Sequence, residues 1–238
     1  MSISAEQQKV YKTGLMYALV SYGAWGIFPL YWKMLLSVPP QQILAHRIIW
    51  SMIFLLLILA WRREKLFLQY FTSPRTLGIL VLTAALIGLN WFTYIWAVNN
   101  NHIVDSSLGY YINPIVNILL GVIFLKERLS RIQLIAVTFA FAGVAFLSWH
   151  YGRLPVISLV LAFSFGLYGL LRKKANLQSM PGLMVETLLL APVALWYLWH
   201  MNTLGSGSFG HVSRLTDFLL MLGGPITALP LFWFGIAA

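Results

Sequence analysis

The chain has 238 residues, of which 60% are hydrophobic and only 9% are charged. Soluble globular chains carry about 25% charged residues, so this composition excludes a soluble domain and indicates a protein whose apolar surface faces lipid. The net charge of +10 comes from short basic clusters between apolar runs, so nucleic acid is not expected as a partner. The absence of cysteine excludes disulfides, thiolate catalysis and cysteine metal sites.

Eight apolar runs are long enough to cross a hydrocarbon core of about 30 Å as helices. In chain order they cover residues 14–32, 43–61, 77–98, 106–125, 132–149, 154–171, 183–199 and 219–238. The runs lack the polar–apolar alternation of membrane-spanning strands. The sequence therefore predicts an all-α, polytopic membrane helix bundle, and we expect its first helix to be retained rather than cleaved as a signal peptide.

Lysine and arginine are distributed unequally between the two sets of loops. The amino-terminal tail and the even-numbered loops carry Lys9, Lys12, Arg62, Arg63, Lys65, Arg75, Lys126, Arg128, Arg131, Arg172, Lys173 and Lys174. The opposite loops carry only Lys33, Arg153 and Arg214. Because basic loops stay in the cytoplasm, we expect a multi-pass protein of the inner, cytoplasmic membrane with its amino terminus in the cytoplasm.

A pattern of serine, aromatic residue, glycine, any residue, aromatic residue and glycine occurs twice, at 21–26 and 164–169. The aromatic run 91–97 is likewise followed about 140 residues later by a similar run at 231–237. Chance similarity between aromatic-rich helices is the alternative. A true repeat has five helices, and an odd number inverts the second copy, as in secondary transporters. We therefore predict a first repeat at 1–150 and an inverted, incomplete second repeat at 151–238, and expect the chain to be a fragment or truncated product of a ten-helix protein.

Several motifs resemble those of one transporter family. The segment 124–130 (FLKERLS), with Gln133 and the pair 143–144, is similar to the EamA repeat of the drug/metabolite transporter superfamily. In finer detail, 25–33 (WGIFPLYWK), 46–47, 90–91 and 108–114 (LGYYINP) resemble RarD-type permeases. The resemblance covers the whole chain and implies ten helices in two inverted repeats, without metal or nucleotide cofactors. It also implies that the protein moves a small metabolite or drug-like solute by alternating access.

Three ionisable side chains in or beside the apolar runs are candidates for function, because charge inside a bilayer is costly. Glu186 either takes up a proton or a cationic solute, or has a structural role as a partner of an arginine or at the interface. Arg47, next to His46, either binds a carboxylate or phosphate of the solute or extends outward to lipid head groups. Asp105, at the start of the fourth run, is expected to stabilise the helix amino terminus.

Aromatic and amide side chains are the remaining candidates for a cavity wall. Pro114 removes one backbone hydrogen bond, and the polar residues before it suit either a gate or a simple kink. The predicted cavity residues are Tyr22, Trp25, His46, Arg47, Asn90, Trp91, Tyr94, Tyr110, Tyr111, Asn113 and Glu186. Trp32, Trp61, Trp149 and Trp199 lie at the ends of runs and are assigned to the interfacial aromatic belt. Gly23, Gly26, Gly121, Gly143 and Gly166 are expected to permit close helix packing.

The alternative function is that of a membrane-embedded enzyme or a non-transporting membrane protein. An enzyme would need clustered catalytic side chains, but the histidines are scattered and no paired-carboxylate or nucleophile motif occurs. No phosphate-binding loop for an ATP-driven pump occurs either. We therefore expect a transporter without cofactors or metals. Its expected partners are a small solute and membrane lipid, and a second copy of the chain is a further candidate.

Overall fold

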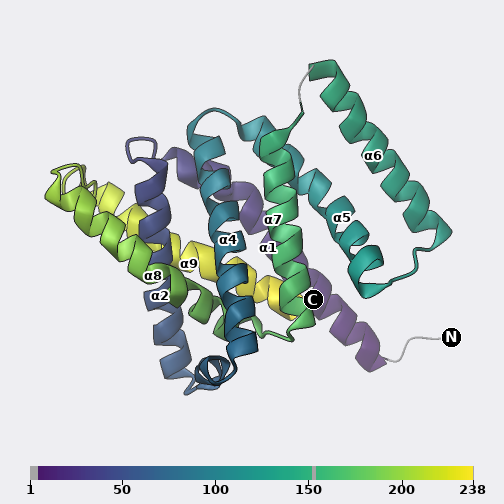
Figure 1. Cartoon of the computed structure of the whole chain (residues 1–238), viewed down its shortest axis with the longest axis horizontal. Helices are drawn as coiled ribbons and strands as arrows, with labels where there is room; N and C mark the ends of the chain where they lie inside the picture. The colour runs from purple at the N-terminus through teal and green to yellow at the C-terminus, as the bar shows by residue number, and fades with distance from the viewer. Residues whose placement is uncertain (1–4, 152–153, 238) are drawn as a thin grey trace. The chain divides into compact units, whose positions relative to one another are not determined.

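The computed structural model describes residues 5–151 and 154–237, which contain helices and no β-strand (Figure 1). Arg153 lies outside these residues, as does the side chain of Lys9, so the loop-charge prediction is not described at those two positions. The helices are α1 (Ala5–Lys33), α2 (Pro40–Trp61), α3 (Leu66–Gln69), α4 (Pro74–Asn99), α5 (Ile103–Leu125), α6 (Arg131–Tyr151), α7 (Val156–Lys174), α8 (Ser179–Thr203) and α9 (Arg214–Ala237).

The eight predicted runs correspond one to one with the eight long helices, and the all-helical, polytopic prediction is confirmed. Six helices in the described residues are long and apolar enough to span a membrane: α2, α4, α5, α7, α8 and α9. The stretch Arg131–Phe146 of α6 is also apolar. In α1 glycine, serine and tyrosine dilute the apolar residues, and it is not among the six. The sequence did not predict α3 or the 3-10 turn Tyr70–Thr72, because their apolar residues are too few to span.

Proline and basic residues mark the ends and the interruptions of the helices. Pro40 begins α2, where its missing N–H costs nothing. Three basic residues close α7, where the helix dipole favours positive charge. Within α9, by contrast, Pro225 and Pro230 both lie in the interior and each removes one ladder hydrogen bond.

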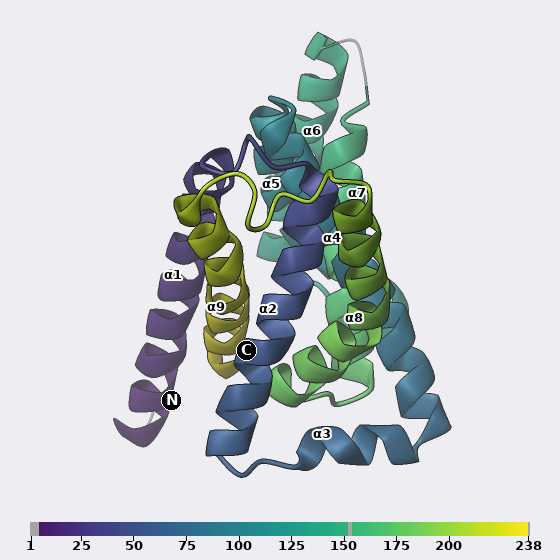
Figure 2. The ribbon, with the colours of Figure 1, turned by 90° about the vertical axis from the view of Figure 1, so that its left-hand side faces the viewer.

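The first of two compact units comprises Met1–Leu80 and Leu177–Ala238. It contains α1, α2, α3, the start of α4, α8 and α9, and its four long helices lie side by side in the order α1, α9, α2, α8 (Figure 2). The hydroxyl of Tyr31 on α1 donates a hydrogen bond to the carbonyl of Leu219 on α9. The backbone N–H of Gln178, just before α8, donates to the hydroxyl of Tyr70, 3.1 Å away. Segments from both ends of the sequence therefore form one unit.

The crossing of α2 and α9 depends on Gly224. A Cβ added at Gly224 would lie 2.4 Å from both the carbonyl carbon and the carbonyl oxygen of Trp50, and 2.8 Å from the backbone nitrogen of Ser51. These are backbone atoms of α2, which cannot rotate away. Only glycine therefore allows α9 to approach α2 this closely.

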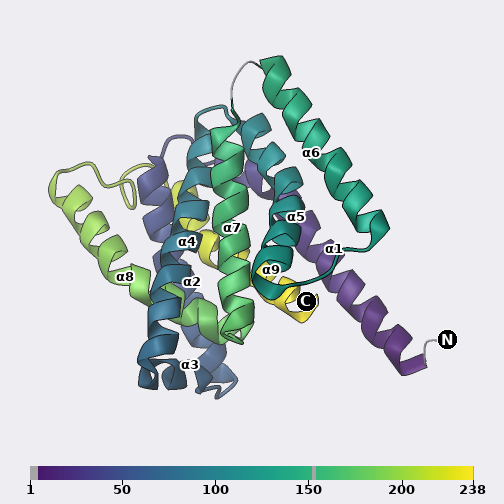
Figure 3. The same cartoon turned by 45° about the vertical axis from the view of Figure 1, so that its right-hand side comes forward.

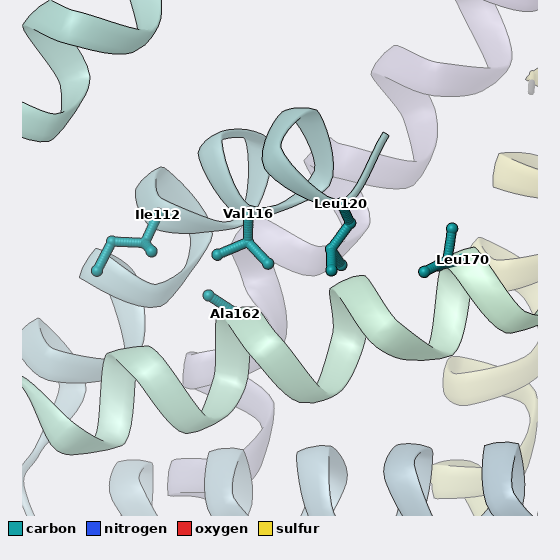
Figure 4. Close-up of a cluster of buried hydrophobic side chains, with 5 residues drawn as sticks. All are labelled: Ile112, Val116, Leu120, Ala162 and Leu170. Carbon is teal, nitrogen blue, oxygen red and sulfur yellow. The ribbon is translucent and has the colours of Figure 1, made fainter. Parts of the chain in front are cut away.

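The second unit, Val81–Asn176, contains most of α4 together with α5, α6 and α7. Figure 3 shows α5 and α7 side by side, with α6 beyond α5. Their interface is a cluster of apolar side chains that face one another in Figure 4: Ile112, Val116 and Leu120 from α5, and Ala162 and Leu170 from α7. The core of this unit is thus the α5–α7 contact.

Glycine makes close helix contacts at only some of the predicted positions. A Cβ added at Gly166 would lie 2.9 Å from Cγ1 of Val116, which confirms the prediction for that residue. At Gly121 the near atom belongs to the flexible side chain of Glu127. At Gly23, Gly26 and Gly143 an added Cβ would have no atom within 4 Å among the described residues, so the prediction of close packing was wrong there.

Candidate solute-binding site

The predicted cavity residues divide between the two units. The first unit holds Tyr22, Trp25, His46, Arg47 and Glu186, and the second holds Asn90, Trp91, Tyr94, Tyr110, Tyr111 and Asn113. Each group has its own geometry and is described within its own unit.

Arg47 lies inside the first unit, two turns into α2, with 5% of its surface exposed. Its Nε donates a hydrogen bond to Oγ1 of Thr227 on α9, 2.6 Å away, and Thr227 donates in turn to the carbonyl of Gly223. The guanidinium carbon lies 5.1 Å from the centre of the Trp32 ring on α1. The side chain is therefore held between α1 and α9 rather than extended toward lipid head groups.

The assignment of Trp32 to the aromatic belt was wrong, because its side chain is fully buried. Its ring supports the guanidinium of Arg47 in a cation–π contact, which is strongest where water is excluded. Trp61, Trp149 and Trp199 are exposed at helix ends, as a belt requires. The sequence offered no comparable signal for Thr227, a small hydroxyl in an apolar run.

Glu186 is also fully buried, on α8, which packs against α2. Among Lys, Arg, Asp and Glu in the described residues, only Arg47 and Glu186 are buried, and both belong to the first unit. Burial of a single charge is very costly, whereas two opposite charges in one low-dielectric interior offset part of that cost. The interior of this unit thus holds one basic and one acidic side chain.

The other candidates of the first unit take part in aromatic contacts. His46 is buried and stacks on Phe209, with ring centres 5.1 Å apart. Tyr22 and Trp25 form an edge-to-face pair with centres 5.4 Å apart on α1, where Tyr22 is exposed. Of these three, only His46 lies next to Arg47.

In the second unit, Asn90 links α4 to α7. Its Nδ2 donates hydrogen bonds to the carbonyl of Leu161 at 2.9 Å and to Oγ of Ser164 at 3.0 Å. Ser164 is the serine of the second copy of the repeated motif. The amide nitrogen of Asn90 is thus engaged in holding two helices together.

Asn90→Leu is expected to destabilise the protein by about 1–3 kcal/mol, because the leucine cannot donate and both hydrogen bonds from α4 to α7 are lost. Thermal unfolding of the purified protein measures the effect. Asn100→Leu is the matched control, since the exposed Asn100 follows α4 directly and its side chain, among the described residues, bonds to the carbonyl of Trp96 in α4. Equal shifts for the two variants would show that the α4–α7 link carries no stability.

The tyrosines of the second unit point in different directions. Tyr94 is buried and meets Tyr110 edge to face, with ring centres 5.9 Å apart, and Trp91 is buried nearby on α4. Tyr111 is 76% exposed and does not share this contact. Asn113 accepts a hydrogen bond from Asn117 at 2.7 Å, and α5 continues through Pro114.

Asp105 lies in the first turn of α5, as predicted, but its carboxylate contacts the side chain of His102 at 2.9 Å. His102, the residue directly before α5, makes no capping hydrogen bond with its side chain. Within the described part of the chain, no group of three or more metal-ligating side chains is found.

Comparison with known proteins decides the family. The profile of the EamA-like transporter family matches residues 12–149, more than half of the chain. The chain belongs to the EamA-like transporter family. The matched region spans α1 to α6 apart from their outer ends, and it includes every predicted cavity residue except Glu186.

Three relatives of this EamA-like chain extend the similarity beyond that region. It is 48% identical over 234 residues to the uncharacterized transporter YojE of Bacillus subtilis, covering 95% of this chain and 77% of the relative. It is 42% identical to protein RarD of Escherichia coli, covering 95% and 77%. It is 33% identical to the chloramphenicol-sensitive protein RarD of Pseudomonas aeruginosa, covering 88% and 72%. No solved structure matches. The EamA-like chain is thus a multi-pass membrane transporter, and the predicted RarD-type resemblance is confirmed.

Proposed function

We propose that this protein is a secondary transporter that moves a small metabolite or drug-like solute across the cytoplasmic membrane by alternating access, with its amino terminus in the cytoplasm. The observation that carries the proposal is the buried Arg47, held inside a spanning helix by Thr227 and Trp32. A charge in that position is costly in a bilayer and is characteristic of a solute or ion pathway.

The arrangement of helices supports an inverted repeat, which is the architecture of many secondary transporters that use alternating access. In an inverted repeat, α1 is equivalent to α7, α2 to α8 and α4 to α9. A two-fold rotation that exchanges the two copies then carries the pair α1–α9 onto the pair α7–α4. The same rotation carries the pair α2–α8 onto itself. Helices α1 and α9 pack together, as do α2 and α8, and Asn90 joins α4 to α7. These pairs are the ones that a two-fold relation between repeats generates.

Uptake into proteoliposomes tests the transport proposal, with and without a pH gradient. Because the Pseudomonas aeruginosa relative is named a chloramphenicol-sensitive protein, chloramphenicol is the first solute to measure, followed by a panel of metabolites. Protein-dependent, saturable movement of one of these solutes would support the proposal. Uptake equal to that of protein-free liposomes for the whole panel would contradict it.

Glu186 is proposed to take up the coupling proton, because it is the buried acid of the described residues. Glu186→Gln is then expected to reduce uptake driven by a pH gradient to the rate without a gradient, since glutamine cannot exchange a proton. Glu127→Gln is the control, because Glu127 is exposed and forms an ion pair with the exposed Lys173 at 3.2 Å. Unchanged gradient-driven uptake in Glu186→Gln would refute proton coupling through this residue.

A further inference from the structure

The connection between α8 and α9, residues 204–213, contains a short segment with a glycine at each end. Gly205 has a φ of +68° and Gly210 a φ of +78°. Both lie in the left-handed region that glycine adopts at little cost. A Cβ at either position would have no atom within 4 Å among the described residues. Four residues, 206–209, therefore lie between two uncrowded glycines, of which Gly210 is held through its backbone N–H by the carboxylate of Asp217 at 2.8 Å.

Gln42, at the start of α2, binds the backbone of this segment through its side-chain amide. Its Nε2 donates to the carbonyl of Ser206 at 2.7 Å, and its Oε1 accepts from the backbone N–H of Ser208 at 2.8 Å. The side chain is almost fully buried. One amide thus makes two hydrogen bonds to the backbone of the segment, and both would break together if the segment moved away.

Phe209 fixes the end of the segment by inserting its ring beside α2. The ring stacks on His46 at 5.1 Å and 26°, and lies 6.2 Å and 36° from the ring of Trp50. His46 and Trp50 are four residues apart on one face of α2, so together they form an aromatic slot. Phe209 is 38% exposed, so its ring lies between these two side chains and the surface of the described residues.

The slot also offers a polar group that Phe209 does not use. The indole N–H of Trp50 is buried and has no hydrogen-bond partner among the described residues. A phenylalanine ring cannot accept a conventional hydrogen bond, whereas a solute ring with an oxygen substituent can. Arg47 follows His46 directly in α2, so the slot lies one residue from the buried cation.

We propose that residues 205–210 form a hinged plug, and that its Phe209 ring occupies the slot in which a flat aromatic ring of the solute, bearing a hydrogen-bond acceptor, binds when the plug lifts. This inference rests on the transport function proposed above. It assigns to that function an aromatic class of solute and a gate at the amino end of α2.

The experiment uses the full chain in liposomes and takes advantage of its lack of cysteine. Ser208→Cys places a thiol on the buried face of the plug while leaving the backbone N–H that bonds Gln42 in place. Its rate of reaction with a water-soluble maleimide reports how often the plug lifts. Adding Phe209→Ala or Gln42→Ala is expected to raise that rate about tenfold, the effect of losing the ring or a pair of hydrogen bonds.

Two alcohols of similar size probe the slot itself. Benzyl alcohol, which is aromatic and carries an oxygen, should compete with Phe209 and accelerate labelling of Ser208→Cys. Cyclohexylmethanol, its saturated counterpart, should not. Adding Trp50→Ala should remove the acceleration. A thiol at Ser106→Cys, buried in the second unit, reports general unfolding and should not respond to the changes at 42 or 209.

An unchanged labelling rate in both Phe209→Ala and Gln42→Ala would overturn the plug. Equal acceleration by the two alcohols would overturn the aromatic slot, because it would show an effect of the alcohols on the bilayer. Labelling requires neither a gradient nor a transported solute. Failure of the plug therefore leaves the uptake result standing, and failure of uptake leaves the labelling result standing.

Discussion

Gly224→Ala is expected to cost about 3 kcal/mol of stability or to prevent α2 and α9 from packing. The added methyl group would overlap backbone atoms of Trp50, the closest at 2.4 Å, and overpacking that cannot relax costs about 1–3 kcal/mol or more. The intrinsic preference of helices for alanine, about 0.5–1 kcal/mol, offsets only part of that cost. Thermal unfolding of the detergent-purified protein measures the change.

Gly23→Ala is the matched control for this substitution. Gly23 is also helical and belongs to the same unit, but an added Cβ would have no atom within 4 Å among the described residues. Its substitution is expected to leave stability unchanged or to raise it slightly. Equal stability of Gly224→Ala and Gly23→Ala would show that α9 does not approach the backbone of α2 this closely at Gly224.

Arg47→Met is expected to reduce uptake at least about tenfold and to lower thermal stability. Methionine fills most of the volume but removes the bond to Thr227, the contact with Trp32 and the buried positive charge. Loss of the hydrogen bond and of the cation–π contact together is expected to cost about 1–3 kcal/mol of stability. Arg47→Lys keeps the charge but not the planar group, so its uptake should lie between the two.

The control for Arg47→Met is Arg214→Met, since Arg214 is exposed at the start of α9. Combining Arg47→Met with Glu186→Gln separates charge from shape, because the double variant carries neither of the two buried ionisable side chains. We expect it to regain thermal stability but not uptake. A double variant no more stable than Arg47→Met alone would show that the two charges are not coupled.

The helices could be predicted from the sequence because membrane spans are set by the length of apolar runs, which is a local property. The eight long helices follow from that property, whereas α3 does not because its four residues carry no periodic signal. Arg47 could also be identified as a candidate from the sequence, because arginine inside an apolar run is rare. The direction of its side chain could not be predicted, since an arginine at this position can extend to lipid head groups or point into the protein.

What the sequence could not reveal are contacts between distant helices. Thr227 and Trp32 are ordinary residues for a membrane helix, and only the packing of α1, α2 and α9 brings them to Arg47. Glycines show the same limit. Gly166 and Gly224 lie at crossings while Gly23 and Gly26 do not, although all four occur in similar apolar surroundings. Asn90 looked like a cavity residue, but its amide spans to α7.

The prolines of α9 give adjacent helices of the first unit different stiffness. Bending a helix usually strains its ladder of backbone hydrogen bonds, but α9 already lacks two of them, at Pro225 and Pro230. Its neighbour α2 has its only proline at the first position and an unbroken ladder beyond it. The two helices cross at Gly224, directly before the first interruption. We therefore expect α2 to be the stiffer of the two helices and α9 to bend more easily beyond Gly224. Elastic deformation of this unit should then concentrate in the carboxy-terminal half of α9.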